Sequence, residues 1–292
     1  MPSSKNLKFS LKHRVEAAAM RGVFALFRAM PLDMASAIGG FLGRSIGGFM
    51  KANKTAQKNI AAVFPDKSEQ EREKIIRKMW GNLGRTAVEM AQLNREEMLK
   101  RIKITGTHNL PAHGKPAFMF SGHLGNWELL AIVAKAGGRP VTGVYREANN
   151  KLADQIVANI RSECYANLIP KGLQGAIKIA RAIKNNEAIA MLVDQKMNDG
   201  IAVPFFGRDA MTAPAIAELA LRYDAPIIPA RVIRTHGANF EAIVYPPIEY
   251  EKTGDKEQDA KNIMLTINKM LEIWICEYPE QWFWVHKRWG KA

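Results

Sequence analysis

The fold is decided by a strand-to-helix stretch, AFMFSGHLGNWE, at residues 117–128. It begins with Ala117–Phe120, a short apolar run of the kind that forms a buried strand. Gly122 and Gly125 then permit a tight turn, and Trp127–Ala136 continues with the spacing of an amphipathic helix. A strand, a glycine-rich turn and a helix in this order are typical of an α/β protein.

Short apolar runs and longer amphipathic runs alternate along the rest of the chain. The further predicted strands are Val141–Tyr145, Glu187–Val193, Pro226–Val232 and Phe240–Tyr245. The further predicted helices are Lys151–Glu163, Ala176–Asn185, Ala213–Tyr223 and Ala260–Cys276, together with one that a capping box at Ser68–Glu71 opens. We therefore predict an α/β fold with a mainly parallel sheet covered by helices.

The composition supports a full hydrophobic core, and the charge is concentrated near the amino-terminal end. Of the 292 residues, 47% are hydrophobic and 24% charged, which excludes a disordered or collagen-like chain. Residues 1–60 contain ten lysines and arginines against Glu16 and Asp33, and so carry eight of the fourteen net positive charges. Such a segment needs an anionic partner, either a membrane or a nucleic acid. Only Cys164 and Cys276 are cysteines, which suits a reducing compartment.

The amino-terminal segment has the pattern of a basic amphipathic helix. Arg14, Arg21 and Arg28 recur every seven residues and line one side. The large apolar residues around them are Val15, Val23, Phe24, Leu26, Phe27 and Met30. This pattern is typical of a helix that lies in the headgroup region of an anionic leaflet, and it also fits a helix packed on the protein's own core. The many apolar residues disfavour nucleic acid, and no run approaches the roughly 20 apolar residues of a spanning helix.

Small residues recur every four positions in the same segment, at Ala35, Gly39, Gly43 and Gly47. They predict a smooth helical face for close packing. The chain contains no internal repeat and no long linker. We therefore expect a basic, amphipathic, membrane-associating helical segment over residues 1–65, followed by one continuous α/β domain over residues 66–292.

Polar residues follow three of the predicted strands, at the edge where parallel sheets bind ligands. The clusters span residues 121–128, 146–150 and 194–196. His123 in the turn and Glu128 in the first helical turns can meet. A carboxylate beside one imidazole nitrogen fixes the tautomer and leaves the other nitrogen to act as a general base. The alternative is a core histidine with a structural hydrogen bond.

Other catalytic chemistries find less support in the sequence. His123 and Glu128 lack the HExxH spacing and a clear third ligand, which disfavours a metal site. Cys164 and Cys276 lie in helical patterns with no adjacent base, which disfavours a thiol nucleophile. We expect general-base catalysis that uses no metal and no cofactor.

Four blocks of sequence, in order along the chain, resemble the late acyltransferases of lipid A biosynthesis. They are the H-x4-E block at Ser121–Glu128; Val144-Tyr145-Arg146 with Asn149, Asn150 and Arg161; Asp194-Gln195 with Val203–Gly207 and Thr212; and Pro279–Trp289. Those enzymes are lauroyl and myristoyl transferases of Gram-negative inner membranes, within the lysophospholipid acyltransferase superfamily. The H-x4-E block alone is weak, whereas four blocks in the right order are specific.

The resemblance implies transfer of a fatty acyl chain from an acyl carrier protein thioester to a hydroxyl of a lipid A precursor, an acylated and phosphorylated glucosamine disaccharide. By the same resemblance His123 deprotonates the hydroxyl and Glu128 orients His123, with no acyl-enzyme intermediate, metal or cofactor. It also implies a peripheral or monotopic enzyme at the cytoplasmic face of the cell inner membrane. The expected partners are acyl carrier protein, the lipid A precursor and an anionic membrane surface, and not nucleic acid.

The same blocks suggest the substrate-binding residues Arg146, Asn149, Arg161, Asp194, Gln195 and Arg208. The arginines are expected to hold phosphates through charge-assisted hydrogen bonds, unless they are ordinary solvated side chains. Asp194 is expected to organise these arginines, to position the acceptor or to cap the following turn. Tryptophans at the carboxyl-terminal end suit an interfacial belt beside Lys287 and Arg288, although core packing explains some of them equally well. They are Trp282, Trp284 and Trp289.

Two other functions remain open at this point. The first is acyl transfer to another lysolipid or glycolipid, although Glu128 in place of aspartate and the tryptophan-rich end argue against the glycerolipid branch. The second is a non-catalytic basic protein that binds a membrane or a nucleic acid. Loss of function on replacing His123 distinguishes a catalyst from such a protein.

Overall fold

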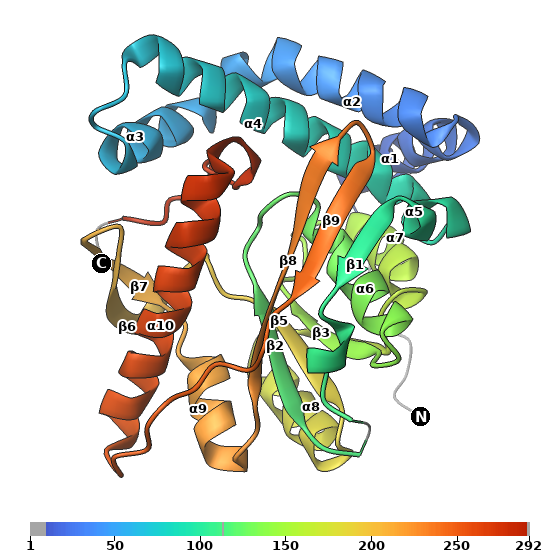
Figure 1. Ribbon diagram of the computed structural model, residues 1–292. Helices are drawn as coiled ribbons and strands as arrows, with labels where there is room; N and C mark the ends of the chain where they lie inside the picture. The colour runs from blue at the N-terminus through green and yellow to red at the C-terminus, as the bar shows by residue number, and fades with distance from the viewer. Residues whose placement is uncertain (1–9, 113, 291–292) are drawn as a thin grey trace.

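The computed structural model describes residues 10–112 and 114–290, and a seven-stranded sheet lies at its centre (Figure 1). The strands lie in the order β1-β9-β8-β2-β5-β3-β4. Their bounds are β1 Ile102–Thr105, β2 Ala117–Ser121, β3 Val141–Tyr145, β4 Asn167–Pro170, β5 Ala188–Leu192, β8 Ile227–His236 and β9 Asn239–Val244. From β8 to β4 all neighbours run parallel, whereas β9 runs antiparallel to β8 and parallel to β1. The predicted mainly parallel sheet is therefore confirmed, and β1 and β4 are additional strands.

Helices cover both faces of this sheet. The longer ones are α1 Leu11–Ala29, α2 Leu32–Ile46, α3 Asn53–Val63, α4 Glu69–Glu89, α5 Glu96–Lys100, α6 Leu130–Ala136, α7 Lys151–Ser162, α8 Leu173–Lys184, α9 Ala215–Tyr223 and α10 Lys256–Glu277. Single 3-10 turns are η1 Gly47–Phe49, η2 Met90–Gln92, η3 Thr107–Asn109, η4 Trp127–Leu129 and η5 Pro279–Gln281. Phe118 and Phe120 of β2 pack into a core shared with α8, α9 and α10, whereas Ala117 and Met119 pack into a core shared with α6. Because β2 is buried on both faces, its carboxyl end is a rigid platform.

The amino-terminal helices pack together, with α2 and α4 side by side (Figure 1). The small-residue face of α2 makes this contact possible: a Cβ atom on Gly43 would lie 2.1 Å from the backbone oxygen of Trp80. The predicted close-packing role of this face is thus confirmed. Ser68 and Glu71 form the predicted capping box at the start of α4. The expected boundary at residue 65 falls between α3 and α4, and residues 1–9, with Lys5 and Lys8, lie outside the described residues.

Some apolar residues of α1 pack against the protein, and others are exposed. Phe27 is buried and Phe24 is half-buried, whereas Val15, Val23 and Leu26 are exposed. On α2 and η1 the outward side is also apolar, and its exposed members are Met34, Phe41, Leu42, Ile46, Phe49 and Met50. We call these six residues the α2 apolar face. Within the described part of the chain, no helix combines the length and the apolar character needed to cross a membrane.

A two-stranded antiparallel hairpin stands apart from the main sheet. It consists of β6 Lys196–Phe205 and β7 Arg208–Thr212, and the sequence patterns did not predict it. Phe206 and Gly207 form its turn with positive φ angles of 51° and 68°. Positive φ at both central residues matches the twist of the flanking strands, which is why two-residue hairpins favour such turns.

Candidate active site

His123 lies in the turn that follows β2, at the carboxyl-end edge of the parallel strands. Gly125 shapes this turn, because it adopts φ +60° and a Cβ atom there would lie 2.0 Å from the backbone oxygen of Val232. Both the left-handed backbone and the close approach require glycine. The His123 side chain is 17% exposed, so the turn presents it at the surface of a depression rather than inside the core.

Asp194 is the carboxylate that holds His123. Its Oδ1 atom lies 2.7 Å from His123 Nδ1, and its Oδ2 atom accepts a 2.7 Å hydrogen bond from the His123 backbone N–H. Trp282 Nε1 donates to the same Oδ2 at 2.8 Å. Burial alone would raise the pKa of Asp194, but the charge of His123 and the hydrogen bonds from His123 and Trp282 lower it to about 2. Asp194 is therefore a buried, ionised partner of the imidazole.

The parallel pairing of β2 with β5 explains this contact. Ser121 at the end of β2 is in register with Leu192 at the end of β5, and the Val193 N–H donates to the Ser121 carbonyl at 3.0 Å. The residues that follow the two strands consequently lie side by side. The prediction that polar clusters after these strands share one edge of the sheet is confirmed.

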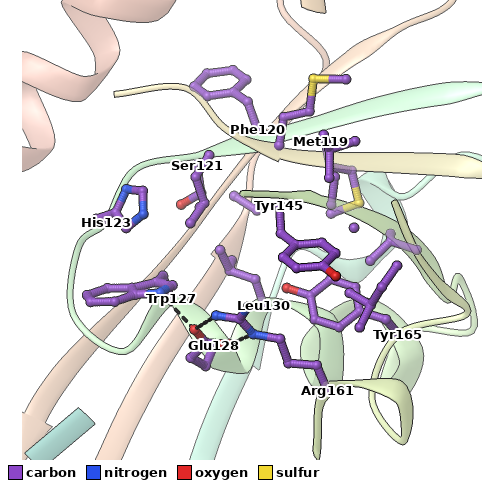
Figure 2. A pocket seen from close by; sticks show the side chains of 18 of the residues that line it. Met119, Phe120, Ser121, His123, Trp127, Glu128, Leu130, Tyr145, Arg161 and Tyr165 are labelled. Carbon is purple, nitrogen blue, oxygen red and sulfur yellow. Dashed lines mark hydrogen bonds and ion pairs between the residues drawn. The ribbon is translucent and has the colours of Figure 1, made fainter. Parts of the chain in front are cut away.

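The prediction that Glu128 orients His123 is wrong. Glu128 lies in η4 and accepts from Arg161 on α7, with Arg161 Nε 2.8 Å from Oε2 and Arg161 Nη2 2.5 Å from Oε1. Trp127 Nε1 also donates to Glu128 Oε1, and the dashed lines in Figure 2 mark these contacts. The 3-10 turn directs the Glu128 side chain toward α7, away from the turn that carries His123.

The Glu128–Arg161 pair is largely buried, with side-chain exposures of 3% and 21%. Although burial opposes the charge of Arg161, the charge of Glu128 and their hydrogen bonds raise the pKa of Arg161 above its ordinary value. Its charge is therefore compensated inside the protein. The phosphate contact predicted for Arg161 stays a prediction.

Gln195 occupies the other side of the His123 ring. The Gln195 amide nitrogen lies 3.3 Å from His123 Nε2. Since Asp194 accepts a hydrogen bond from Nδ1–H, Nε2 of the neutral ring carries the lone pair, and the amide can donate to it. This assignment follows from the hydrogen-bond partners. Nε2 is therefore the ring nitrogen that can take up a proton, and both His123 and Gln195 line the adjoining pocket.

A pocket of about 250 Å³ opens beside His123 (Figure 2). Its walls come from β2, β3 and β5, together with α6 and α7. The apolar lining includes Met119, Leu130, Val141, Val144, Leu168, Ala190 and Met191. His123, Gln195, Arg146 and Lys171 provide polar groups. A cavity that combines apolar walls with converging polar groups suits a small molecule or lipid with both apolar and polar parts.

The other predicted binding residues lie in different places. Arg146 lines the pocket and is exposed. Asn149 is exposed and is not among the pocket-lining residues, whereas its neighbour Asn150 caps α7 and donates to the backbone of His13 on α1. Arg208 lies on the hairpin, with its guanidinium 5.3 Å from the centre of the Trp289 ring. The sequence patterns missed Lys171, which follows β4 and lines the pocket.

The carboxyl-terminal tryptophans do not form an exposed belt. Trp282 and Trp284 are 2% and 0% exposed, and Trp289 is half-buried against the hairpin. Arg288, expected beside a membrane, is fully buried and donates to Met211 and Thr212 of β7. The interfacial interpretation is wrong because these side chains fill the space between the hairpin and the site.

The same segment completes the turn that carries His123. Leu124 and Trp282 form an isolated antiparallel bridge, and the Phe283 N–H donates to the His123 carbonyl at 3.0 Å. The Phe283 ring lies 5.7 Å from the imidazole. The sequence signal for this role was present, since the block Pro279–Trp289 is one of the four that carry the resemblance.

Neither cysteine is arranged as a nucleophile. Burial raises the pKa of the Cys164 thiol to about 11 and also raises the pKa of Cys276 above its ordinary value. A thiol with a raised pKa is mostly protonated near neutral pH and is a poor nucleophile. Among the described residues, no three His, Cys, Asp or Glu side chains gather in a way that could hold a metal ion.

A histidine–carboxylate pair at the strand edge of an α/β fold, beside a pocket with apolar and polar walls, is an arrangement suited to an enzyme active site. The sequence model for bacterial lipid A biosynthesis acyltransferases matches residues 5–291. The chain belongs to this family. It is an acyltransferase of lipid A biosynthesis.

Two sequence relatives carry names from the same family. The chain is 25% identical over 277 residues to a lipid A biosynthesis acyltransferase of Haemophilus influenzae, which covers 90% of this chain and 85% of that protein. It is 28% identical over 284 residues to the lipid A biosynthesis lauroyltransferase of Escherichia coli, covering 91% and 89%. The solved 1-acyl-sn-glycerophosphate acyltransferase of Thermotoga maritima aligns with a TM-score of 0.40 and 12% identity, over 82% of this chain and 96% of that one.

Proposed function

We propose that this acyltransferase moves a fatty acyl chain from an acyl carrier protein thioester to a hydroxyl of a lipid A precursor, with His123 as the general base and Asp194 as the group that orients it. One observation carries the proposal. The Asp194 carboxylate engages Nδ1 of His123, while Nε2 is directed toward Gln195 and the pocket. The catalytic pair is thus His123 with Asp194, in place of His123 with Glu128.

The chemistry follows from this pair. His123 Nε2 removes the proton of the acceptor hydroxyl as its oxygen attacks the thioester carbonyl carbon. The new C–O ester bond forms, the C–S bond breaks, and the imidazolium returns its proton to the leaving thiolate. The carboxylate of Asp194 stabilises the transient imidazolium and fixes the ring. A general base of this kind contributes roughly 100- to 10,000-fold in rate.

The pocket suits the two substrates in different ways. Its apolar walls match a fatty acyl chain, while Arg146 and Lys171 provide cations for a phosphate group. Burial lowers the pKa of Lys171, Asp194 opposes this effect, and Arg146 adds to it. Two cations held near each other favour an anion with more than one negative oxygen. The overall basic charge of the chain also favours approach of an acidic carrier protein.

The place of action in this proposal is the cytoplasmic face of the inner membrane, reached by peripheral or monotopic attachment. The α2 apolar face supports it, because Phe49 and Phe41 are 91% and 62% exposed within the described residues. Arg44, Lys51 and Lys54 lie in the same segment, and basic residues beside apolar ones favour anionic lipid surfaces.

Acyl transfer by the purified enzyme tests the proposal. The assay uses an acyl carrier protein thioester and, in parallel, an acylated phosphorylated glucosamine disaccharide and a lysophospholipid as acceptors. We expect transfer to the disaccharide, loss of at least about 100-fold in rate for His123→Ala, and an unchanged rate for His108→Ala, an exposed histidine in η3. Transfer only to the lysophospholipid, or full activity of His123→Ala, would overturn it.

A further inference from the structure

A buried ion pair lies directly behind the turn that carries His123. Arg234 of β8 and Glu89 of α4 form two hydrogen bonds, with Nη1 2.5 Å from Oε1 and Nη2 2.8 Å from Oε2. Their side chains are 8% and 0% exposed. Neither residue lines the pocket, and the reaction proposed above uses neither.

The ion pair and its neighbours on α4 contact the turn at two points, one on a side chain of the turn and one on its backbone. Asn126, three residues after His123, donates through Nδ2 to Glu89 Oε2 at 2.8 Å. The Gly125 carbonyl accepts from Asn82 Nδ2 at 2.9 Å and from Thr86 Oγ1 at 3.3 Å. Glu89 and these two groups of α4 therefore fix the residues that follow the base.

Arg234 in turn fixes the groups that hold the turn. Its Nε atom donates to Asn82 Oδ1 at 2.8 Å, and its Nη2 atom donates to Thr86 Oγ1 at 3.3 Å. Each α4 side chain that contacts the turn therefore also accepts a hydrogen bond from the Arg234 guanidinium. Because the groups share partners, moving one of them disturbs the others.

The network also reaches α2. Ser36 Oγ donates to Glu89 Oε1 at 2.7 Å, and Arg85 Nη1 donates to Ser36 Oγ at 2.8 Å. Ser36 lies on the buried side of α2, opposite the α2 apolar face. A continuous chain of hydrogen bonds therefore runs from α2, through Glu89, to Asn126.

Stability alone does not account for such a network. A buried ion pair contributes little net stability compared with well-packed apolar residues of similar volume, because the desolvation of both charges offsets their attraction. What it adds is direction, since charge-assisted hydrogen bonds fix angles as well as distances. The groups it fixes here are the two residues of the turn nearest to α4.

We propose that Glu89 and Arg234 are positioning residues of the acyl-transfer reaction, which hold Gly125 and Asn126 and thereby aim His123 Nε2 at the acceptor hydroxyl. This inference rests on the proposed function, in which His123 is the general base. On this inference, Glu89 and Arg234 affect kcat and do not take part in substrate binding.

Asn126→Ala is the variant that cuts the link without leaving a new buried charge beside the pocket. A displacement of about 1 Å at a reacting group costs up to about 100-fold in rate. We expect kcat to fall about 10- to 100-fold while KM for both substrates changes less than about threefold. The matched control is Asn268→Ala, because Asn268 is equally buried and donates one hydrogen bond, to the Pro204 carbonyl, away from the turn.

Glu89→Gln combined with Arg234→Met removes the pair without leaving an unpaired buried charge, and this double variant carries the test if Asn126→Ala fails to fold. We expect the same loss of kcat at nearly constant KM, with a near-ultraviolet circular dichroism spectrum that matches the wild type. If kcat of the folded variants stays within threefold of that of Asn268→Ala, or if only KM changes, the inference is wrong while the proposed function stands. An inactive wild type, or an active His123→Ala, would instead remove the proposed function and this inference together.

Discussion

Asp194 accepts two hydrogen bonds from His123, one from the ring nitrogen Nδ1 and one from the backbone N–H, each at 2.7 Å. One carboxylate therefore fixes both the orientation of the imidazole and the path of the turn that carries it. Its two oxygens divide the task, since Oδ1 contacts the ring and Oδ2 contacts the backbone and Trp282.

Asp194→Asn should retain the fold and lose most of the activity. The amide keeps the shape of the carboxylate but removes the charge that stabilises the imidazolium, and it can turn its NH2 group toward Nδ1. We expect a rate at least about 100-fold below the wild type in the acyl-transfer assay. Asp199→Asn, at an exposed position in β6, is the matched control and should remain fully active.

The low pKa of Asp194 also predicts how stability depends on pH. Its pKa is lowered from 3.8 to about 2 in the folded protein. A depressed pKa stabilises the fold above pH about 4, and this contribution disappears as the pH falls to about 2. Urea unfolding should show the wild type losing on the order of 2 kcal/mol more than Asp194→Asn over this interval. Equal losses would mean that the carboxylate has no such effect.

The Glu128–Arg161 pair should matter for stability through its burial. Glu128→Gln leaves the Arg161 charge in a mostly buried site, which costs about 3 kcal/mol of unfolding free energy. The double variant Glu128→Gln with Arg161→Met should recover much of this loss, because it removes the unpaired charge. Denaturant unfolding of the two single variants and the double variant measures the coupling. Additive losses would contradict the pairing.

The contact between α2 and α4 should tolerate no side chain at Gly43. Gly43→Ala places a Cβ atom against the Trp80 backbone, which cannot move without displacing α4. We expect a loss of about 1–3 kcal/mol in the unfolding free energy. Gly22→Ala, on α1 with no atom within 4 Å of the added Cβ, is the control and should instead stabilise by about 0.5–1 kcal/mol.

The α2 apolar face should control binding to lipid. Phe49→Glu removes a ring that is 91% exposed in the free protein. Since inserting one such side chain is worth about 1.5–3 kcal/mol, we expect binding to vesicles rich in phosphatidylglycerol to weaken at least about tenfold. Ile273→Glu changes an apolar residue on α10 that is 58% exposed, outside the α2 apolar face, and should leave binding unchanged. Equal effects of the two changes would refute the assignment of this face.

The strand and helix patterns around the site were predictable from local sequence, but the partner of His123 was not. β2, β3 and β5 are short apolar runs followed by polar residues, so their shared edge followed from the topology of parallel sheets. The choice between Glu128 and Asp194 depends instead on which strands are neighbours. β5 lies next to β2 although about 70 residues separate them, and spacing along the chain carries no such information.

The carboxyl-terminal block shows the same limit in another form. Tryptophans beside basic residues give the same local sequence pattern whether the side chains face a membrane or pack inside the protein around a buried guanidinium. In the fold, Arg288 packs over Phe205 and donates to the hairpin, so its guanidinium is directed into the protein and away from solvent. The hairpin itself escaped prediction because its turn depends on positive φ at Phe206, a bulky residue that rarely adopts it.

The bridge between Leu124 and Trp282 joins segments more than 150 positions apart in sequence. Contacts of such wide separation form late, because the intervening chain must first be closed into a loop. The imidazole therefore acquires its final surroundings only after the carboxyl-terminal segment has reached the turn. Docking of the carboxyl-terminal segment and assembly of the candidate active site are, for this reason, coupled.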